Sequence, residues 1–349
     1  MRQAFLKLLL LAAVLTLAPA VRAQVINTSL ATLPEADALI YISPQRILNE
    51  AAPHALTPAD VTNMRNAFAD IKKNTGVDPS TIEYLVIAVR FHKPASDLSF
   101  VAPDVMAVFG GDFSSESLMT FAQLAMEDKV RVEKYGSKSI SLVKIDPIAA
   151  EAEKNPMLKS FAELGAVPLS PNSLAIGNLR YLKSAIDAAE GNGRISAAAL
   201  ESLMRDPNAL IAAAGSPLAS FAKSFGLMGL ETTSRDSRCD TSFGNFYAAV
   251  TMAGTNFSLR GAMNADNPDT AKIIKGLLSG LMQQGISAIP DKGAQTILQS
   301  LKMTARESEI VLEADIPEKV VADLIRSTPK KQEAPQTAPK RPVRKKRTK

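Results

Sequence analysis

The fold class is decided by residues 301–316, which read Leu-Lys-Met-Thr-Ala-Arg-Glu-Ser-Glu-Ile-Val-Leu-Glu-Ala-Asp-Ile. Apolar side chains occupy every second position on both sides of a short polar break. These positions are Leu301, Met303 and Ala305 before the break and Ile310, Leu312 and Ala314 after it. Alternation with a period of two is typical of half-buried strands, so this stretch predicts an antiparallel hairpin.

Residues 130–145 show the same pattern. Val130 and Val132 alternate with charged residues, Gly136 supplies a turn, and Ile140 and Leu142 alternate with serines. This stretch therefore predicts a second hairpin, and we match it to residues 301–316.

The elements before each hairpin also come in the same order. In the first half we expect a strand at 38–42, a helix at 58–73 capped by Thr57, strands at 82–91 and 104–110, and a helix at 115–126. In the second half we expect a strand at 209–214, a helix at 217–225, strands at 246–252 and 256–263, and a helix from 266 to 284. The repeat predicts two similar α+β units, residues 24–206 and 207–327. Hairpins and short connections favour antiparallel or mixed sheets with helices packed on one face. The pattern leaves open whether the two units share one sheet.

The N-terminal residues 1–23 have the layout of a cleavable signal peptide. Arg2 and Lys7 precede an apolar run, and Val21-Arg22-Ala23 ends in a small residue at the expected cleavage point. The run is shorter than the roughly 20 residues of a spanning helix. We therefore expect an exported chain that is periplasmic or secreted, begins at Gln24 and has no lipoprotein cysteine.

Charge divides the chain into two parts. The whole chain carries +5; the leader contributes +3 and residues 328–349 contribute +8, which leaves −6 for residues 24–327. The cations of this C-terminal tail are Lys330, Lys331, Lys340, Arg341, Arg344, Lys345, Lys346, Arg347 and Lys349. Its composition predicts a disordered segment. Two interpretations stay open. The tail contacts anionic lipid, lipopolysaccharide or an acidic envelope polymer, or it is a solvated tail that aids solubility or folds back on the acidic body. Nucleic acid is the less expected polyanion outside the cytoplasm.

Few residues in this sequence are candidates for catalysis or metal binding. The chain has one cysteine, Cys239, which predicts either a free thiol or a link between two chains. His54 and His92 are far apart in sequence and lack a second ligand type at metal spacing. Residues 266–269 (Asp-Asn-Pro-Asp) resemble the start of a calcium loop, but a helix N-cap explains them better. We therefore expect neither a cofactor nor a metal.

One spacing has catalytic precedent. Ser-x-x-Lys, in which a lysine activates a serine, occurs at Ser220 and Lys223 on a predicted helix and at Ser141 and Lys144 in a predicted hairpin. The hairpin does not suit the chemistry, and the helical pair is expected to face solvent. Gly276 and Gly280 form a Gly-x-x-x-Gly pattern that we interpret as close packing of a soluble helix.

Residues 33–43 (Leu-Pro-Glu-Ala-Asp-Ala-Leu-Ile-Tyr-Ile-Ser) resemble the opening of exported bacterial proteins of unknown function. Those proteins open with Leu-Pro, an acidic residue and a short apolar strand, and continue as repeated α+β units. The resemblance implies an exported bacterial protein and brings no activity, ligand or site with it.

Together these features predict an exported, non-enzymatic envelope protein with a binding or structural role. Its basic tail is expected to contact anionic surfaces. One alternative is a periplasmic carrier of an apolar ligand, because the helices are rich in Met and Ala. Another is a hydrolase that uses Ser220 and Lys223. The oligomeric state is left open.

Overall fold

The structure is a computed structural model, and it describes residues 29–92, 102–125, 129–145, 161–216, 245–288 and 292–327. The strands are β1 (Ala38–Ile42), β2 (Ile82–Arg90), β3 (Asp104–Gly111), β4 (Val130–Tyr135), β5 (Lys138–Lys144), β6 (Glu163–Ser170), β7 (Ser173–Gly177), β8 (Ile211–Gly215), β9 (Phe246–Ala253), β10 (Asn256–Asn264), β11 (Lys302–Arg306) and β12 (Glu309–Ile316). The helices are α2 (Pro44–Arg46), α3 (Ala52–Ala55), α4 (Pro58–Thr75), α5 (Ser115–Ala125), α7 (Leu179–Ala189), α8 (Ala197–Leu203), α10 (Pro268–Ala288), α11 (Lys292–Ser300) and α12 (Glu318–Ser327). A π-helical turn, η1 (Ile47–Ala51), joins α2 to α3, and a 3-10 turn, η2 (Pro79–Thr81), precedes β2.

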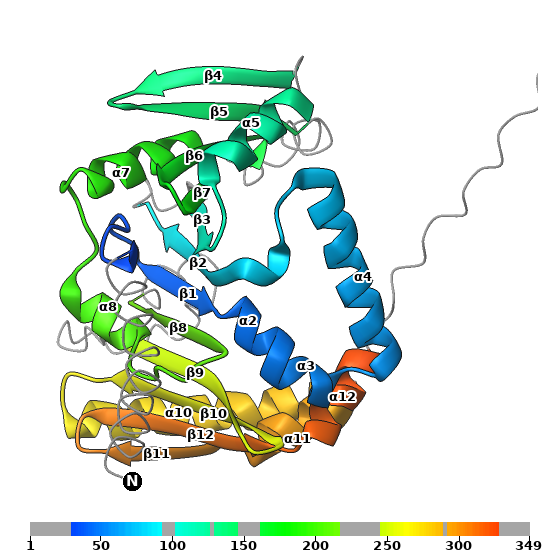
Figure 1. The fold of residues 1–349 in the computed structure, drawn as a ribbon. Coiled ribbons are helices and arrows are strands. Elements are labelled where there is room, and N and C mark those ends of the chain that lie inside the picture. The colour runs from blue at the N-terminus through cyan, green and yellow to red at the C-terminus, as the bar shows by residue number, and fades with distance from the viewer. Residues whose placement is uncertain are drawn as a thin grey trace, which may run out of the picture.

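The twelve strands of the described residues form one antiparallel sheet in the order β11-β12-β10-β9-β8-β1-β2-β3-β7-β6-β5-β4 (Figure 1). The predicted α+β class is confirmed. Strands β1 and β8 pair at the centre, with Tyr41 opposite Ala212, so the two predicted units share a single sheet.

The sheet order corrects the matching of the two hairpins. Outward from the central pair, β1-β2-β3-β7-β6 on one side corresponds to β8-β9-β10-β12-β11 on the other. The hairpin at 163–177 therefore occupies the place equivalent to that at 301–316. The hairpin at 130–145 is an addition at the far edge of the first half. Alternation identified strands correctly but could not identify their neighbours, because pairing partners are set by long-range packing.

Helices cover both faces of the sheet, which corrects the prediction that they pack on one. Directly opposed residues of antiparallel strands point to the same face, so the register assigns each side chain to a face. Tyr41, Val86 and Ala212 share one face and belong to the core cluster that includes Leu182 of α7. The side chains of Met263 and Ile310 point to the opposite face and pack with α10. The central strands are apolar on both faces, so they need cover on both.

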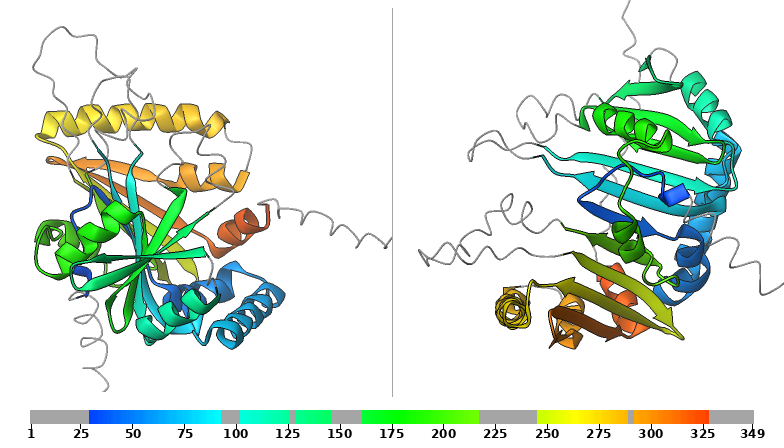
Figure 2. Two further views of the ribbon diagram at one scale, coloured as in Figure 1. Left: turned by 90° about the horizontal axis from the view of Figure 1, so that it is seen from above. Right: turned by 90° about the vertical axis from the view of Figure 1, so that its left-hand side faces the viewer.

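Helix α4 begins and ends as the sequence predicts. The Oγ1 atom of Thr57 accepts a hydrogen bond from the backbone N–H of Asp60 (3.2 Å), Pro58 takes the first turn, and Gly76 ends the helix in the left-handed region with φ +72°. The helix stands at the end of the strands, attached mainly through α3 and η2 (Figures 1 and 2). From Pro58 to Asn74, not one residue is buried.

Within the described residues, none of the helices combines the length and the apolar character needed to cross a membrane.

Candidate functional site

A charged cluster lies where β2 ends and β3 begins. Its centre is Asp104, whose side chain is 3% exposed. The Nε and Nη2 atoms of Arg180 donate to Oδ1 of Asp104 at 3.2 and 2.8 Å, and Nε2 of His92 lies 2.7 Å from Oδ2. Arg90 approaches Oδ2 to 3.5 Å. Three groups able to carry positive charge therefore surround one buried carboxylate.

The sequence brings this cluster together at the start of α7. The Oδ1 atom of Asn178, the N-cap residue, accepts from the backbone N–H of Val105 (2.9 Å), which ties the helix start to β3. The preceding Gly177 lies so close to β3 that a Cβ there would come within 2.5 Å of the Val105 carbonyl oxygen. A glycine is therefore required for this approach, and it places Arg180 beside Asp104.

Tyr181 packs against Arg90 of the cluster and ties it to the backbone near Glu35. Its hydroxyl donates to the carbonyl of Glu35 (2.9 Å), and the guanidinium of Arg90 lies over its ring, 5.0 Å from the centroid. Burial raises the pKa of the Tyr181 hydroxyl, so it remains a neutral donor. The Nε atom of Arg90 is buried and has no hydrogen-bond partner among the described atoms.

The position of one proton decides how the cluster is bonded. Nε2 of His92 lies 2.6 Å from Nη2 of Arg180 as well as 2.7 Å from Asp104. With a proton, Nε2 donates to Asp104; without it, Nε2 accepts from Arg180. In either state the carboxylate is engaged by its neighbours. The geometry therefore fits a clamp between α7 and the sheet better than an acid–base catalyst.

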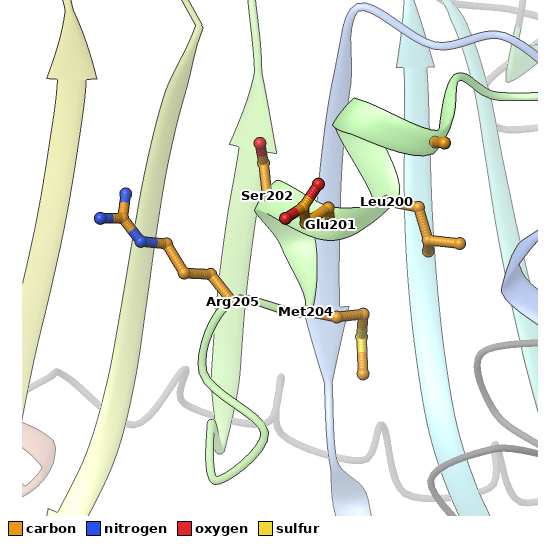
Figure 3. Close-up of a pocket in the computed structure, with 6 residues that line it drawn as sticks. Leu200, Glu201, Ser202, Met204 and Arg205 are labelled. Carbon is orange, nitrogen blue, oxygen red and sulfur yellow. The ribbon is translucent and has the colours of Figure 1, made fainter.

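The second candidate is an open hollow of about 810 Å³ beside α8 (Figure 3). It is lined by Ala197, Leu200, Glu201, Ser202, Met204 and Arg205. Figure 3 shows Arg205 directed away from Leu200 and Met204, toward the neighbouring strands. Its guanidinium lies 4.5 Å from the centroid of the Tyr247 ring and donates to Glu309 (3.2 Å). The hollow thus has an apolar part and a separate charged rim.

The structure separates the residues that the sequence singled out. His54 of α3 pairs with Glu318 of α12 (2.8 Å), whereas His92 follows β2 and pairs with Asp104 of β3 (2.7 Å). Among the described residues, no group of three or more His, Cys, Asp or Glu side chains is placed to hold a metal ion. Asn267 is the N-cap of α10, because its Oδ1 accepts from the N–H of Thr270 (2.9 Å), which confirms the N-cap interpretation.

The Ser-x-x-Lys spacings do not form a site in the part of the chain that is described. Ser141 and Lys144 lie on β5, where residues three apart point to opposite faces, and Ser141 accepts from Gln123 (2.8 Å). Ser220, Lys223 and Cys239 lie outside the described residues. So do all nine tail cations, from Lys330 to Lys349.

The prediction for Gly276 and Gly280 is wrong. A Cβ at either position would meet nothing within 4 Å, so no described part of the chain packs against these glycines. The cluster around Asp104 was not predicted from the sequence. The only local signal was a pair of titratable residues, His92 and Asp104, on either side of one connection between strands.

Comparisons with known proteins give no family. No family model matches the chain, and no curated protein matches it. Among solved structures, three crystal forms of TP0453 are similar: form III (TM-score 0.44, 9% identity), form I (0.42, 10%) and form IV (0.42, 9%). Each covers 85% of this chain, which corresponds to 97%, 96% and 96% of the respective TP0453 chain.

Proposed function

We propose that this protein is exported and acts in the cell envelope by binding, with its basic tail held against an anionic surface. The observation that carries the proposal is the charge division: −6 on residues 24–327 against +8 on residues 328–349. Each cation close to an anionic membrane contributes about 1 kcal/mol of attraction, so a tail with nine of them binds without a folded site.

The proposal includes the organisation of the chain. Residues 1–23 are a signal peptide, residues 24–206 and 207–327 are two similar units, and residues 328–349 are the contact segment. The matching strand order on the two sides of the β1–β8 pair supports the repeat. The mutual pairing of His92, Asp104 and Arg180 supports a binding role over catalysis, because these titratable groups engage one another.

Co-sedimentation with envelope membranes of the host tests the proposal. The full chain is compared with a variant in which all nine tail cations are replaced by glutamine. We expect the full chain to bind at low salt and release at moderate salt, and the variant to lose most of the binding. A control variant replaces the exposed Lys302 and Arg306 of β11 by glutamine and should bind as the parent does. Equal binding by the parent and the tail variant would contradict the proposal.

A second candidate is carriage of a small, partly apolar ligand, and the hollow beside α8 favours it. Its volume of about 810 Å³ lies in the range of small-molecule sites, and Leu200 and Met204 line it. Native mass spectrometry of protein purified from its host should then show an added mass. That mass should be absent in a Met204→Trp variant, which fills the hollow. An unmodified mass for the parent chain would reject this candidate.

A further inference from the structure

Strand β4 forms one of the two edges of the sheet. It stands last in the strand order, and among the described strands it pairs only with β5 (Figure 1). Its outer side therefore presents backbone N–H and C=O groups that no described strand meets. Such an edge is a template on which a strand of another chain can pair. The other edge is β11, so the sheet offers two edges that can be compared.

The face of β4 toward α7 carries two opposite charges. Glu133 reaches the ammonium of Lys183 on α7 at 2.6 Å, and Arg131 shares this face because strand residues two apart do. The guanidinium of Arg131 lies 3.1 Å from a carboxylate oxygen of Glu133 and 3.0 Å from one of Glu163 on β6. The Arg131 side chain is still 56% exposed, and a guanidinium has five N–H donors. It can therefore bind a further carboxylate at the edge.

The other face of β4 carries an exposed apolar side chain between these charges. Val132 lies opposite Ser141 of β5, whose Oγ accepts from Gln123 of α5 (2.8 Å). Directly opposed residues share a face, so Val132 lies on the face that α5 contacts. Val132 is 53% exposed. A strand added at the outer edge would place a side chain beside it and remove part of that surface from water.

The sequence of β4 is complementary to itself. Two identical antiparallel strands of one continuous sheet are related by a two-fold axis perpendicular to the sheet, so opposed residues come from the same face. In the register centred on Val132, Arg131 of each copy lies opposite Glu133 of the other, and the two valines meet at the axis. Opposite charges then attract on one face while the valines pack on the other. The next register, centred on Glu133, would instead oppose two carboxylates.

The β11 edge does not suit a second copy in this way. Its residues include two cations and no acid, and the register that pairs all five brings Lys302 of each copy opposite Arg306 of the other. Strand β11 also adjoins β12, which leads into α12 and the basic tail. Strand β4 lies ten positions from β12 in the strand order, or roughly 48 Å at ordinary strand spacing. Pairing through β4 therefore keeps the starts of the two tails apart by more than the screening length of about 8 Å.

We propose that β4 is a dimerisation edge, at which a second copy of this chain adds its own β4 in the register centred on Val132. The proposal concerns assembly and does not depend on the proposed function. The chain's own tail is a poorer occupant of this edge, because four of its residues lack the N–H that a strand ladder needs: Pro329, Pro335, Pro339 and Pro342. A strand of another protein would have to carry the same pair of charges in the reverse order, which a second copy supplies by symmetry.

Charge reversals in the full chain test the pairing by sedimentation velocity. Arg131→Glu opposes two acids and Glu133→Arg opposes two bases, each at two places in the dimer. Each change should weaken self-association by about tenfold or more. A mixture of the two variants should associate again, because the new acid of one copy faces the new base of the other while the native Arg131 and Glu133 also face each other. Arg306→Glu, a matched charge reversal at the exposed β11 edge, should associate as the parent does.

Cysteine cross-linking tests the register without a change of sign at the charged face. In a Cys239→Ser background, Val132→Cys places two thiols on opposed residues, whose Cα atoms lie roughly 4.5–5.5 Å apart in an antiparallel pair and are within reach of a disulfide. Lys134→Cys lies on the same face and is also exposed, but its two copies are four residues apart along the strands, or about 14 Å. Mild oxidation should therefore link Val132→Cys and leave Lys134→Cys unlinked.

The outcomes separate the alternatives. A parent chain that stays monomeric at every concentration overturns the proposal, and so does a dimer that neither charge reversal weakens, since the second copy would then bind elsewhere. Equal linking by Val132→Cys and Lys134→Cys would show random collision and reject the register. If a charge reversal disturbs folding, which circular dichroism would reveal, the comparison of the two cysteine variants still decides. The tail is unchanged in all these variants, so the proposed function stands or falls separately.

Discussion

Helices α4 and α7 are both amphipathic, yet they relate to the sheet in opposite ways. Five residues of α7 are buried, including Tyr181, Leu182 and Ile186, whereas none is buried from Pro58 to Asn74 of α4. Helix α7 lies across β3, β5, β6 and β7, while α4 is attached near its ends to α3 and η2. An apolar stripe therefore shows which side of a helix avoids water. It does not show how completely the sheet covers that side.

A glycine in the sheet leaves the space that α7 needs to pack closely. Gly165 of β6 lies under the helix, and a Cβ there would come 2.6 Å from Cδ1 of Leu182. Bare backbone at this position lets Leu182 sit against Ile140 and Leu142 of β5, which lie 3.1 and 3.0 Å from the same point. For α4, no core cluster of the described residues offers an equivalent seat.

The largest expected effect is on the buried helix. Leu182 is fully buried, so Leu182→Ala leaves a cavity and should lower the free energy of unfolding by about 2–5 kcal/mol. Urea denaturation measures this change. Leu182→Met, which nearly conserves volume, should cost less than about 1.5 kcal/mol. If the alanine variant were as stable as the parent, the contrast between the two helices would be lost.

The clamp on the first turn of α7 gives the next effect. Asp104→Asn removes the charge that Arg180 and His92 contact and should cost about 2–3 kcal/mol in urea denaturation. Asp323→Asn, which breaks an exposed pair with Arg326 on α12, is the control and should cost less than about 1 kcal/mol. Equal effects from the two changes would show that the cluster does not hold α7 in place.

A smaller effect is expected where α4 joins the body, and it depends on pH. Hydrogen bonds from Ser80 and the ammonium of Lys72 lower the pKa of Asp78 to about 2 from 3.8. Because the folded pKa lies below the unfolded one, this stabilisation is present above about pH 4 and is lost as the pH falls toward 2. The stability difference between the parent and Asp78→Asn should therefore be constant near neutral pH and disappear over that interval. A difference that persists at the acid end of that interval would contradict the assignment.

The smallest effect is expected on the exposed helix. Phe68→Ala removes a large apolar side chain that is not buried, so the free energy of unfolding should change by no more than about 0.5 kcal/mol. Thermal and urea denaturation together check this. A loss approaching that of Leu182→Ala would mean that α4 is packed in solution, and the two helices would no longer differ.

Sequence patterns identified the elements better than their neighbours. The hairpin alternation, the Thr57 cap and the Asn267 cap were predictable because each depends on residues only a few positions apart. The β1–β8 pair and the contact of Asp104 with Arg180 were not, because these partners are brought together only by the folded sheet. The stripe on α4 was visible in the sequence, but that the rest of the molecule covers it only in part was not, since the same spacing occurs in helices that are fully packed.

The β1–β8 pair has a consequence for how the chain folds. Residues 38–42 come long before residues 211–215 in the sequence, so β1 can pair with β2 before β8 reaches its other edge. That edge of β1 is short and apolar, and its backbone N–H and C=O groups are unpaired. A strand of another chain can therefore pair with it. Until β8 pairs with it, this edge of β1 is therefore a place where incompletely folded chains can associate, and the arrival of β8 removes it.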